Sequence, residues 1–399
     1  MNHQTPKGTV KSGFEKVKAV FAENFKKRGE LGASCCAFYR GEKVVDLWGG
    51  IRDEATGAAW EEDTMSIVFS TTKGVSSMAM AHAHSQGLFD YDDPVTQYWP
   101  EFAANGKAEI TIRQVLSHQA GLCAIDEPLG LEQLGNPDAL AAAIGIQKPA
   151  WTPGEKHGYH GISLGWYESE IIRRADPQGR TIGQYFSDEI AKPLGLDFYI
   201  GLPDDIPRSR LATIKGNKPW QMLFNLNKMP FGFVRHFLNP KSLTARSFMN
   251  PIILGKTGNY NKPALQRIEI AAANGIGNAR SVAKAYSEFA TGGKILGLKP
   301  TTLAALEQPA TTPTNGSMDQ VLHIKTAYAL GYLKPSPEFQ FGSSSKAYGT
   351  PGAGGSFGFA DPDAQLSFAY TMNKCGFYLF DDPREKALRD AVYECIKKV

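Results

Sequence analysis

Both ends of the chain have the pattern of a helix with a pair of strands, and this match constrains the fold more than any other feature of the sequence. Near the N-terminus, apolar residues recur on one helical face over residues 12–28, where Ser12 and Glu15 form a capping-box pattern. Two runs with the composition of strands follow at 33–39 and 43–50, separated by a short glycine-containing turn. The N-terminal end therefore predicts a helix followed by a β-hairpin.

The C-terminal end mirrors this arrangement. Residues 355–361 and 365–373 have the pattern of two strands joined by a Pro-Asp turn, and Leu388, Val392 and Ile396 recur at the spacing of a helix. We predict that the two ends complete one antiparallel sheet flanked by terminal helices.

Between these ends the sequence changes character. From residue 74 to about 290, helical patterns and long loops dominate, and few segments alternate as strands do. We therefore predict an α+β fold in which residues 1–73 and 291–399 form the sheet domain and residues 74–290 form a mostly helical insertion. A chain of 399 residues with 42% hydrophobic residues has ample material for such a core.

Charge and cysteine usage limit the setting in which the chain works. The 43 basic and 40 acidic residues are scattered, with a net charge of +3, which argues against nucleic acid as a partner. No apolar run approaches the ~20 residues of a membrane span, and the polar residues 1–11 show no secretory signal. The five cysteines are an odd number without disulfide or metal spacing. We expect a cytoplasmic protein with reduced thiols and no transmembrane segment.

One segment stands out for its aromatic content. Residues 220–238 hold Trp220, Phe224 and three further phenylalanines, together with a proline and a glycine. This composition fits an ordinary buried irregular segment. It also fits an apolar lid or acyl-binding wall, because such walls favour aromatic side chains. Both interpretations stay open for the loop 218–238, and the second makes Trp220 and Phe224 candidate substrate contacts.

Two Gly-x-Ser-x-Gly strings, centred on Ser163 and Ser356, suggest a nucleophile of the α/β-hydrolase type. That motif requires a buried strand before the serine and a histidine later in the chain. No histidine follows Ser356, because the last one is His323. Ser163 has histidines downstream, but a polar, glycine-containing stretch precedes it instead of a strand. Ser163 therefore remains only a weaker alternative.

A different serine chemistry uses the string Ser-x-x-Lys. On a helix these two residues share a face, and a lysine whose pKa is lowered by burial can accept the serine proton. The string begins at Ser70, Ser281 and Ser343. Only Ser70 follows an apolar run and precedes a helix of small residues, although an N-cap role fits it too. Ser281 fits a helix N-cap, and Ser343 lies in a polar Gly/Ser loop.

Several segments together resemble the serine β-lactamase and penicillin-binding-protein superfamily. They run from about residue 30 to 375, so the resemblance covers nearly the whole chain. Within the superfamily, the chain is most similar to the family VIII carboxylesterases, which are related to class C β-lactamases. The matching segments are 69–74, 88–95, 116–122, 151–154 with Tyr159, 274–277 and 352–359.

The resemblance implies a role for each matching residue. Ser70 corresponds to the acylated nucleophile and Lys73 to its partner base. Tyr159 corresponds to the tyrosine that moves protons between the serine, the leaving group and the incoming water. A tyrosine close to a charged lysine is expected to have a lowered pKa. The backbone N–H groups of Ser70 and Ala353 correspond to the oxyanion hole.

Two positions depart from the β-lactamase pattern. Where the family has a lysine or histidine on a strand facing the nucleophile, this chain has Thr350, followed by a proline and Gly352. A literal Lys-Thr-Gly string is present at 256–258, but it lies too far from the C-terminal strands to match the family motif by position. Tyr159 is followed by His160 and a glycine instead of a residue and then asparagine. Thr350, Gly352 and His160 are expected to border the substrate. Without the cation and the amide a β-lactam is held less well, whereas an ester needs less help because an alkoxide leaves more easily than an amine.

The sequence therefore predicts a serine carboxylesterase that hydrolyses small or short-acyl esters through an acyl-enzyme on Ser70. The alternatives are β-lactamase or D-amino-acid peptidase activity, acyl transfer to an alcohol, and a catalytically weak scaffold that kept the fold. No cofactor is implied, and no metal site is expected, because His82 and His84 are two apart on a predicted helix and do not share a face. The expected partner is a small-molecule ester.

Overall fold

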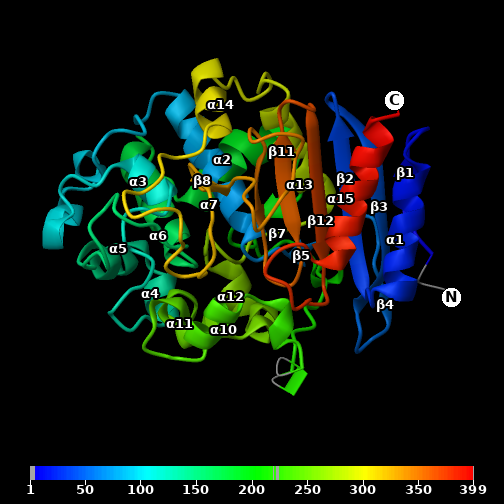
Figure 1. Ribbon diagram of the computed structural model, residues 1–399, viewed down its shortest axis with the longest axis horizontal. Helices are drawn as coiled ribbons and strands as arrows, with labels where there is room; N and C mark the ends of the chain where they lie inside the picture. The colour runs from blue at the N-terminus through cyan, green and yellow to red at the C-terminus, as the bar shows by residue number, and fades with distance from the viewer. Residues whose placement is uncertain (1–4, 219, 222–223, 399) are drawn as a thin grey trace.

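The computed structural model describes residues 5–218, 220–221 and 224–398. In this part of the chain, a nine-stranded antiparallel sheet has helices on both faces and adjoins a larger, mostly helical region (Figure 1). The strands follow the order β1-β3-β2-β12-β11-β10-β9-β8, and β4 pairs with β3. Their bounds are β1 (Lys7–Val10), β2 (Gly32–Tyr39), β3 (Glu42–Asp53), β4 (Ala58–Ala59), β8 (Tyr328–Ala329), β9 (Tyr332–Leu333), β10 (Tyr348–Pro351), β11 (Phe357–Asp361) and β12 (Leu366–Met372).

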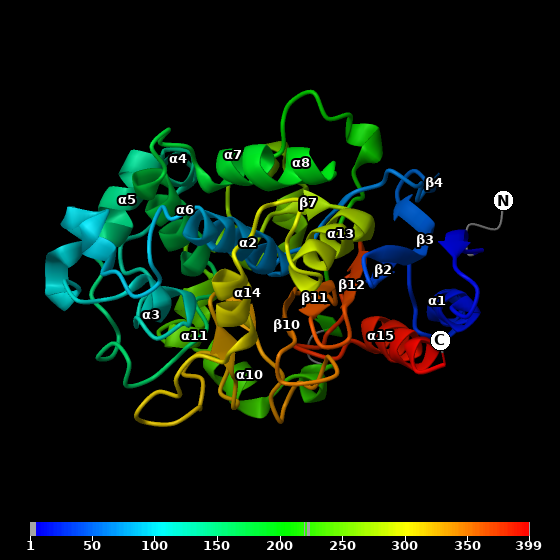
Figure 2. The same cartoon turned by 90° about the horizontal axis from the view of Figure 1, so that it is seen from above.

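The two chain ends meet inside this sheet, which confirms the predicted arrangement. Strand β12 from the C-terminal end pairs with β2 from the N-terminal end along its whole length. Strands β2 and β3 form the predicted hairpin, whose tight turn has left-handed backbone at Arg40 and Gly41, with φ of 53° and 80°. Helices α1 (Glu15–Lys27) and α15 (Pro383–Ile396) lie side by side on one face of the sheet (Figure 2).

The other face of the sheet is covered by α13 (Ala279–Ala290), which packs against β2, β11 and β12. Its buried side chains include Val282, Tyr286 and Phe289, which recur at helical spacing toward the sheet. The predicted boundary at residue 290 assigns this helix to the insertion, whereas its packing assigns it to the sheet.

Two predicted helix starts also differ. Helix α1 begins at Glu15 after Phe14, and Ser12 does not cap it; instead the Gly13 N–H donates to the Glu15 carboxylate. Helix α13 is capped by Asn278, whose side chain accepts the Ser281 N–H, so Ser281 lies inside the first turn and is not the cap. A side chain therefore caps α13 but not α1.

The helical region is organised around α2 (Thr71–Ser85), in which every residue except His84 is buried. Its small residues allow this close packing: a Cβ at Gly74 would lie 1.9 Å from the Tyr286 hydroxyl. No helix of the described residues is long and apolar enough to cross a membrane. Further α-helices of the described residues are α3 (Ile112–Leu116), α4 (Leu131–Leu134), α5 (Pro137–Gly145), α6 (Ser163–Ala175), α7 (Ile182–Phe186), α8 (Lys192–Leu194), α10 (Phe231–Phe237), α11 (Leu243–Phe248), α12 (Pro263–Arg267) and α14 (Pro300–Glu307). The small sheet β5-β7-β6 contains β5 (Ser66–Ile67), β7 (Ile276–Gly277) and β6 (Phe198–Tyr199).

The five cysteines are free and buried, which confirms the prediction of unpaired thiols. Cys35 and Cys36 are neighbours on β2, so their side chains leave the strand on opposite faces. Burial raises the pKa of both thiols well above its usual range, which makes them unreactive at neutral pH.

Candidate active site

Ser70 lies directly before α2, where the strands of the small sheet lead into the helical region. The preceding residue, Phe69, has a φ of 47°, a left-handed conformation that costs on the order of 1 kcal/mol for a residue other than glycine. Two hydrogen bonds hold the turn: the Val68 N–H donates to Gly275 O at 3.0 Å, and the Gly275 N–H donates to Thr72 Oγ1 at 2.9 Å. The Asn-Gly-Ile-Gly segment therefore fixes the backbone beside Ser70.

Lys73 lies one helical turn beyond Ser70, and its Nζ is 3.2 Å from Ser70 Oγ. The amine also donates to Gly161 O at 2.5 Å and to Ala272 O at 2.9 Å. Because these carbonyls accept two N–H groups, a neutral amine keeps its lone pair for the Ser70 hydroxyl proton. The side chain is fully buried, and desolvation lowers the pKa of Lys73 to about 7. This lysine can therefore accept a proton near neutral pH.

A buried carboxyl group, which the sequence analysis did not identify, acts on this lysine. Glu168 of α6 accepts hydrogen bonds from Ser76 Oγ at 2.7 Å and from Ser77 Oγ at 2.8 Å, both on α2. Its negative charge opposes the desolvation that lowers the pKa of Lys73, and burial raises the pKa of Glu168 itself to about 7. No sequence pattern marks Glu168, because only the packing of α6 on α2 brings it to this place.

We expect kcat/KM for an ester to rise with pH through about 7 and then level off, because protonated Lys73 cannot accept the serine proton. The variant Glu168→Gln removes the charge that favours the protonated lysine. The rising limb of the pH profile, where kcat/KM increases as Lys73 loses its proton, is therefore expected to move to lower pH. Rate profiles between about pH 5 and 9 measure both effects.

The control for this profile is His160→Gln, which is expected to keep the limb near pH 7 because the pKa of His160 is about 4. Loss of the limb in the His160 variant contradicts the assignment of Lys73 as the base. An unmoved limb in Glu168→Gln contradicts the electrostatic role of Glu168.

Tyr159 lies beside both residues. Lys73 Nζ is 4.7 Å from the centre of its ring, and the Ser70 hydroxyl lies beside its phenol. Burial raises the pKa of Tyr159 well above its usual value of 10, so the predicted lowering by Lys73 is wrong. Desolvation by burial is the largest cause of this shift. The phenol stays protonated at neutral pH and can donate a proton.

Asp319 holds Tyr159 in place, and the sequence analysis did not identify it either. Its carboxylate accepts the Tyr159 N–H at 3.0 Å and the Tyr328 hydroxyl at 2.6 Å. It also accepts the N–H groups of Val321 and Leu322, which orders its own loop. A single aspartate in a loop has no spacing that distinguishes it from a surface residue.

The sequence predicts that His160 borders the substrate, but the structure encloses this side chain in the core. The ring is fully buried, its Nδ1 donates to Gly158 O at 2.7 Å, and its Nε2 accepts the Leu122 N–H at 3.0 Å. Desolvation lowers the pKa of His160 to about 4, which keeps the ring neutral. With both nitrogens engaged, His160 positions the backbone after Tyr159 and has no free polar atom for a ligand.

The competing serines have structural partners. Ser163 Oγ donates to Leu122 O, and Ser281 Oγ accepts a backbone N–H. The glycine after Ser163 serves close packing, because a Cβ at Gly165 would lie 2.4 Å from the Ala272 nitrogen. Ser343 Oγ donates to the carboxylate of Asp361 at the end of β11. Of the candidate serines in the described chain, only Ser70 has a lysine amine against its hydroxyl.

The turn after β10 packs closely against Val68, two residues before Ser70. Ser356 Oγ donates to Val68 O at 2.7 Å, and a Cβ at Gly352 would lie 2.3 Å from the same oxygen. Position 352 therefore requires glycine. Across the described backbone, neither the Ser70 N–H nor the Ala353 N–H donates to another backbone group. Both are available for an oxyanion, as an oxyanion hole requires.

Gly352→Ala is expected to lower kcat by roughly 10²-fold or more, because the new methyl group displaces the turn that carries the Ala353 N–H. Gly258→Ala is the matched control, since nothing lies within 4 Å of its added Cβ and it belongs to the Lys-Thr-Gly string at 256–258. Steady-state kinetics and thermal unfolding of both variants test this. A folded Gly352→Ala protein with parental kcat contradicts the role of the turn.

Thr350, which the sequence predicts to border the substrate, is instead buried in the core. Its side chain is buried, and its Oγ1 lies 3.1 Å from the position of a Cβ on Gly74, beside the Tyr286 hydroxyl. The hydroxyl is thus enclosed between β10, α2 and α13 and does not face substrate. The literal Lys-Thr-Gly string lies in a 3₁₀ turn with Lys256 exposed, so it is no substitute for the missing cation.

The aromatic segment is divided between the site and the surface. Phe233 is buried and its ring centre lies 6.1 Å from that of Phe248, which lies 6.1 Å from the Tyr159 ring. Trp220 and Phe224 are 57% and 79% exposed and contact each other. The prediction of a fully buried segment is therefore wrong, whereas substrate contact by Trp220 and Phe224 stays a prediction. Residues 219 and 222–223 of this loop lie outside the described residues.

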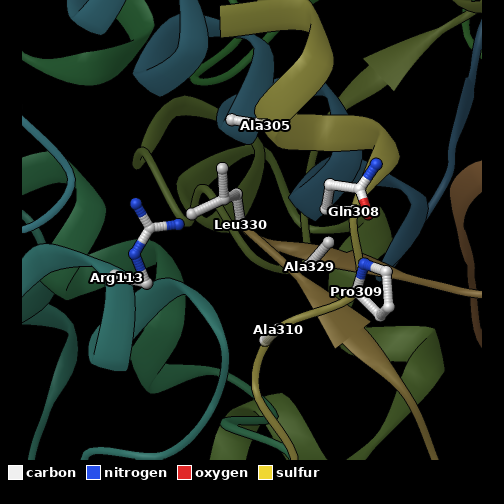
Figure 3. A pocket seen from close by; sticks show the side chains of 7 residues that line it. All are labelled: Arg113, Ala305, Gln308, Pro309, Ala310, Ala329 and Leu330. Atoms are coloured by element: carbon white, nitrogen blue, oxygen red, sulfur yellow. The ribbon is translucent and has the colours of Figure 1, made fainter.

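A hollow of about 170 Å³ lies between α3, α14 and β8 (Figure 3). None of its lining residues belongs to the site around Ser70, and Arg113 at its edge is paired with Asp92 at 2.6 Å. It is lined by Arg113, Ala305, Gln308, Pro309, Ala310, Ala329 and Leu330.

Comparisons with known proteins identify the family of the chain. Residues 17–392 match the family model described as Beta-lactamase. The esterase/beta-lactamase LipL of Mycobacterium tuberculosis is 31% identical over 375 residues, which are 92% of this chain and 82% of that protein. A family VIII carboxylesterase structure covers 98% of this chain and 99% of its own, at 32% identity and a TM-score of 0.85. A penicillin-binding protein homolog from Caulobacter crescentus gives 34% identity and a TM-score of 0.84, with 98% and 99% covered. The chain therefore belongs to the beta-lactamase family of serine hydrolases.

Proposed function

We propose that this enzyme is a carboxylesterase that hydrolyses esters with short acyl chains through an acyl-enzyme on Ser70. The observation that carries the proposal is the contact of Lys73 with Ser70, in a site where position 350 holds an enclosed threonine instead of a cation. The named activities of LipL and of the family VIII carboxylesterase support the same reaction class.

In this mechanism neutral Lys73 accepts the Ser70 hydroxyl proton while Oγ attacks the ester carbonyl carbon. The N–H groups of Ser70 and Ala353 stabilise the negative charge on the carbonyl oxygen, each contributing about 3 kcal/mol by analogy with measured oxyanion donors. The Tyr159 phenol donates its proton to the departing alkoxide and is reprotonated from Lys73. Water then attacks the acyl carbon, and the pair of Lys73 and Tyr159 takes up the proton that the water loses. The bond between the acyl carbon and Ser70 Oγ breaks, and the same pair returns a proton to Ser70 Oγ, which releases the acid and restores the free serine.

The preference for esters follows from what a β-lactam requires. Its carboxylate must be held and its amide nitrogen must be protonated on departure. A charge-assisted hydrogen bond to that carboxylate is worth roughly 2 kcal/mol, and a neutral hydroxyl contributes about 1 kcal/mol. Because Thr350 is turned into the core, even that neutral contact is missing. An ester, whose alkoxide leaves more readily, is affected least.

Steady-state assays on p-nitrophenyl acetate, butyrate and hexanoate beside nitrocefin and penicillin G test this proposal. We expect kcat/KM for the best ester to exceed that for either β-lactam by roughly 10²-fold or more. Equal or higher values for a β-lactam overturn it in favour of β-lactamase activity. Added alcohols test for acyl transfer: a new ester product, formed at the expense of hydrolysis, favours an acyltransferase. A fluorophosphonate probe tests for a scaffold: no labelling of Ser70 together with no turnover favours that alternative.

A further inference from the structure

The surface around α10 is unusual in its exposed apolar side chains. In the part of the chain that the structure describes, six of the ten exposed large hydrophobic residues fall between residues 220 and 252. Phe224, Phe231 and Ile252 are 79%, 80% and 77% exposed. Single exposed apolar residues are ordinary, but a concentration of this kind marks an interaction surface. The six are Trp220, Phe224, Phe231, Leu238, Met249 and Ile252.

The same segment is strongly basic. Residues 206–268 contain eleven lysines and arginines and no aspartate or glutamate. The even scatter of charges that the whole-chain totals indicate therefore does not hold here. Four of these cations pair with carboxylates from elsewhere in the chain, for example Arg246 with Asp126 and Lys215 with Glu54. Five others are exposed and have no carboxylate partner among the described residues: Lys218, Lys228, Arg235, Lys241 and Lys256.

One face of α10 combines apolar and basic side chains, and neighbouring segments that carry other members of the set contact α10 or α11. Phe231, Arg235 and Leu238 follow the spacing i, i+4, i+7 and are all exposed, so they lie on one helical face. The opposite face carries Phe233, which packs inward toward Phe248 and Tyr159. Figure 1 shows α10 and α11 together at the lower edge of the molecule, away from the terminal helices of the sheet.

We propose that the described residues of 218–256 form a docking surface for an anionic phospholipid bilayer. Exposed aromatic and aliphatic side chains enter the headgroup region, and the five unpaired cations bind the lipid phosphates. Aromatic residues flanked by lysine and arginine are the composition of such interfacial surfaces. Aliphatic Leu238 and Ile252 favour lipid over nucleic acid, because they cannot stack on bases. This binding does not depend on whether the site hydrolyses esters.

Vesicle flotation tests the proposal with the full chain. Vesicles of phosphatidylcholine alone are compared with vesicles that contain about 30% phosphatidylglycerol, in about 0.1 M and about 0.5 M salt. We expect at least about tenfold stronger binding to the anionic vesicles in low salt, and loss of most of it in high salt. The double variants Phe231→Ser with Ile252→Ser, and Arg235→Glu with Lys241→Glu, are each expected to weaken binding by about tenfold or more.

Matched variants elsewhere on the surface serve as controls. Ile146→Ser with Ile295→Ser removes exposed apolar groups outside the segment, and Lys18→Glu with Lys26→Glu changes exposed charges on α1. Both are expected to bind as the parent does, and circular dichroism checks that every variant is folded. Binding without preference for anionic lipid, or equal losses in the control variants, overturns the proposal. Tighter binding of duplex DNA than of vesicles also overturns it, because the surface then binds nucleic acid. If vesicle binding is absent and Phe231→Ser with Ile252→Ser dissociates a dimer, the surface binds a second copy of the chain, and the proposal fails as well.

Discussion

Ser70→Ala is expected to lower kcat on p-nitrophenyl butyrate by roughly 10³-fold or more, because the covalent route through the acyl-enzyme is lost. Ser70 Oγ is the hydroxyl that lies 3.2 Å from a lysine amine whose pKa is about 7. The residual rate reflects binding and the oxyanion donors alone. Steady-state kinetics on the purified variant, with thermal unfolding to confirm the fold, measures this effect.

The other serines supply the controls for this experiment. Ser163→Ala and Ser281→Ala remove hydroxyls that bond only to backbone groups, and each is expected to keep kcat within about tenfold of the parent. A folded Ser70→Ala protein with near-parental turnover rules out Ser70 as the nucleophile. A collapse of activity in Ser163→Ala alone transfers the role to Ser163.

Lys73→Arg is expected to lose roughly 10³-fold in kcat although it keeps a positive charge. A guanidinium stays protonated throughout the accessible pH range and cannot accept the serine proton. Its larger, planar group also cannot occupy the cavity in which the amine reaches both Gly161 O and Ala272 O. Lys73→Met, which is similar in length and neutral, is expected to be as inactive and to keep the fold more closely. Single-turnover kinetics with p-nitrophenyl acetate measures the acylation step directly.

The lysines of the other two strings are the matched controls. Lys346→Met breaks a surface ion pair with Asp363, and Lys284→Met alters a partly exposed residue of α13. Both are expected to leave the acylation rate within about twofold, since surface pairs contribute little. An acylation rate in Lys73→Met equal to that of the parent shows that another group deprotonates Ser70.

Features that depend on short spacing could be predicted from the sequence. Alternation over a few residues identified β2, β3, β11 and β12, and the matching ends predicted that they share a sheet. The i, i+3 spacing of Ser70 and Lys73 predicted their contact, because any helix puts such residues on one face. The helix caps at Ser12 and Ser281 were predicted incorrectly, because the first residue of a helix is not fixed by a short pattern: Phe14 and Asn278 occupy the two N-cap positions.

The groups that tune the site could not be predicted in this way. Glu168 reaches the neighbourhood of Lys73, and Asp319 reaches the Tyr159 backbone, only through the packing of distant segments. The direction of the Tyr159 pKa shift was predicted incorrectly for the same reason. Proximity to a lysine suggests a lowering, but the burial that raises the pKa is a property of the assembled core.

The sequence by itself determined the sheet built from both chain ends and the pairing of Ser70 with Lys73, since periodicity and one helical turn are local properties of the chain. Only the tertiary structure decided that Thr350 and His160 turn inward and that Trp220 and Phe224 face solvent. Exposure and desolvation are set by contacts between residues far apart in sequence, and no local spacing records them. The same contacts lower the pKa of Lys73 to about 7, which is what allows a lysine to act as a base at neutral pH.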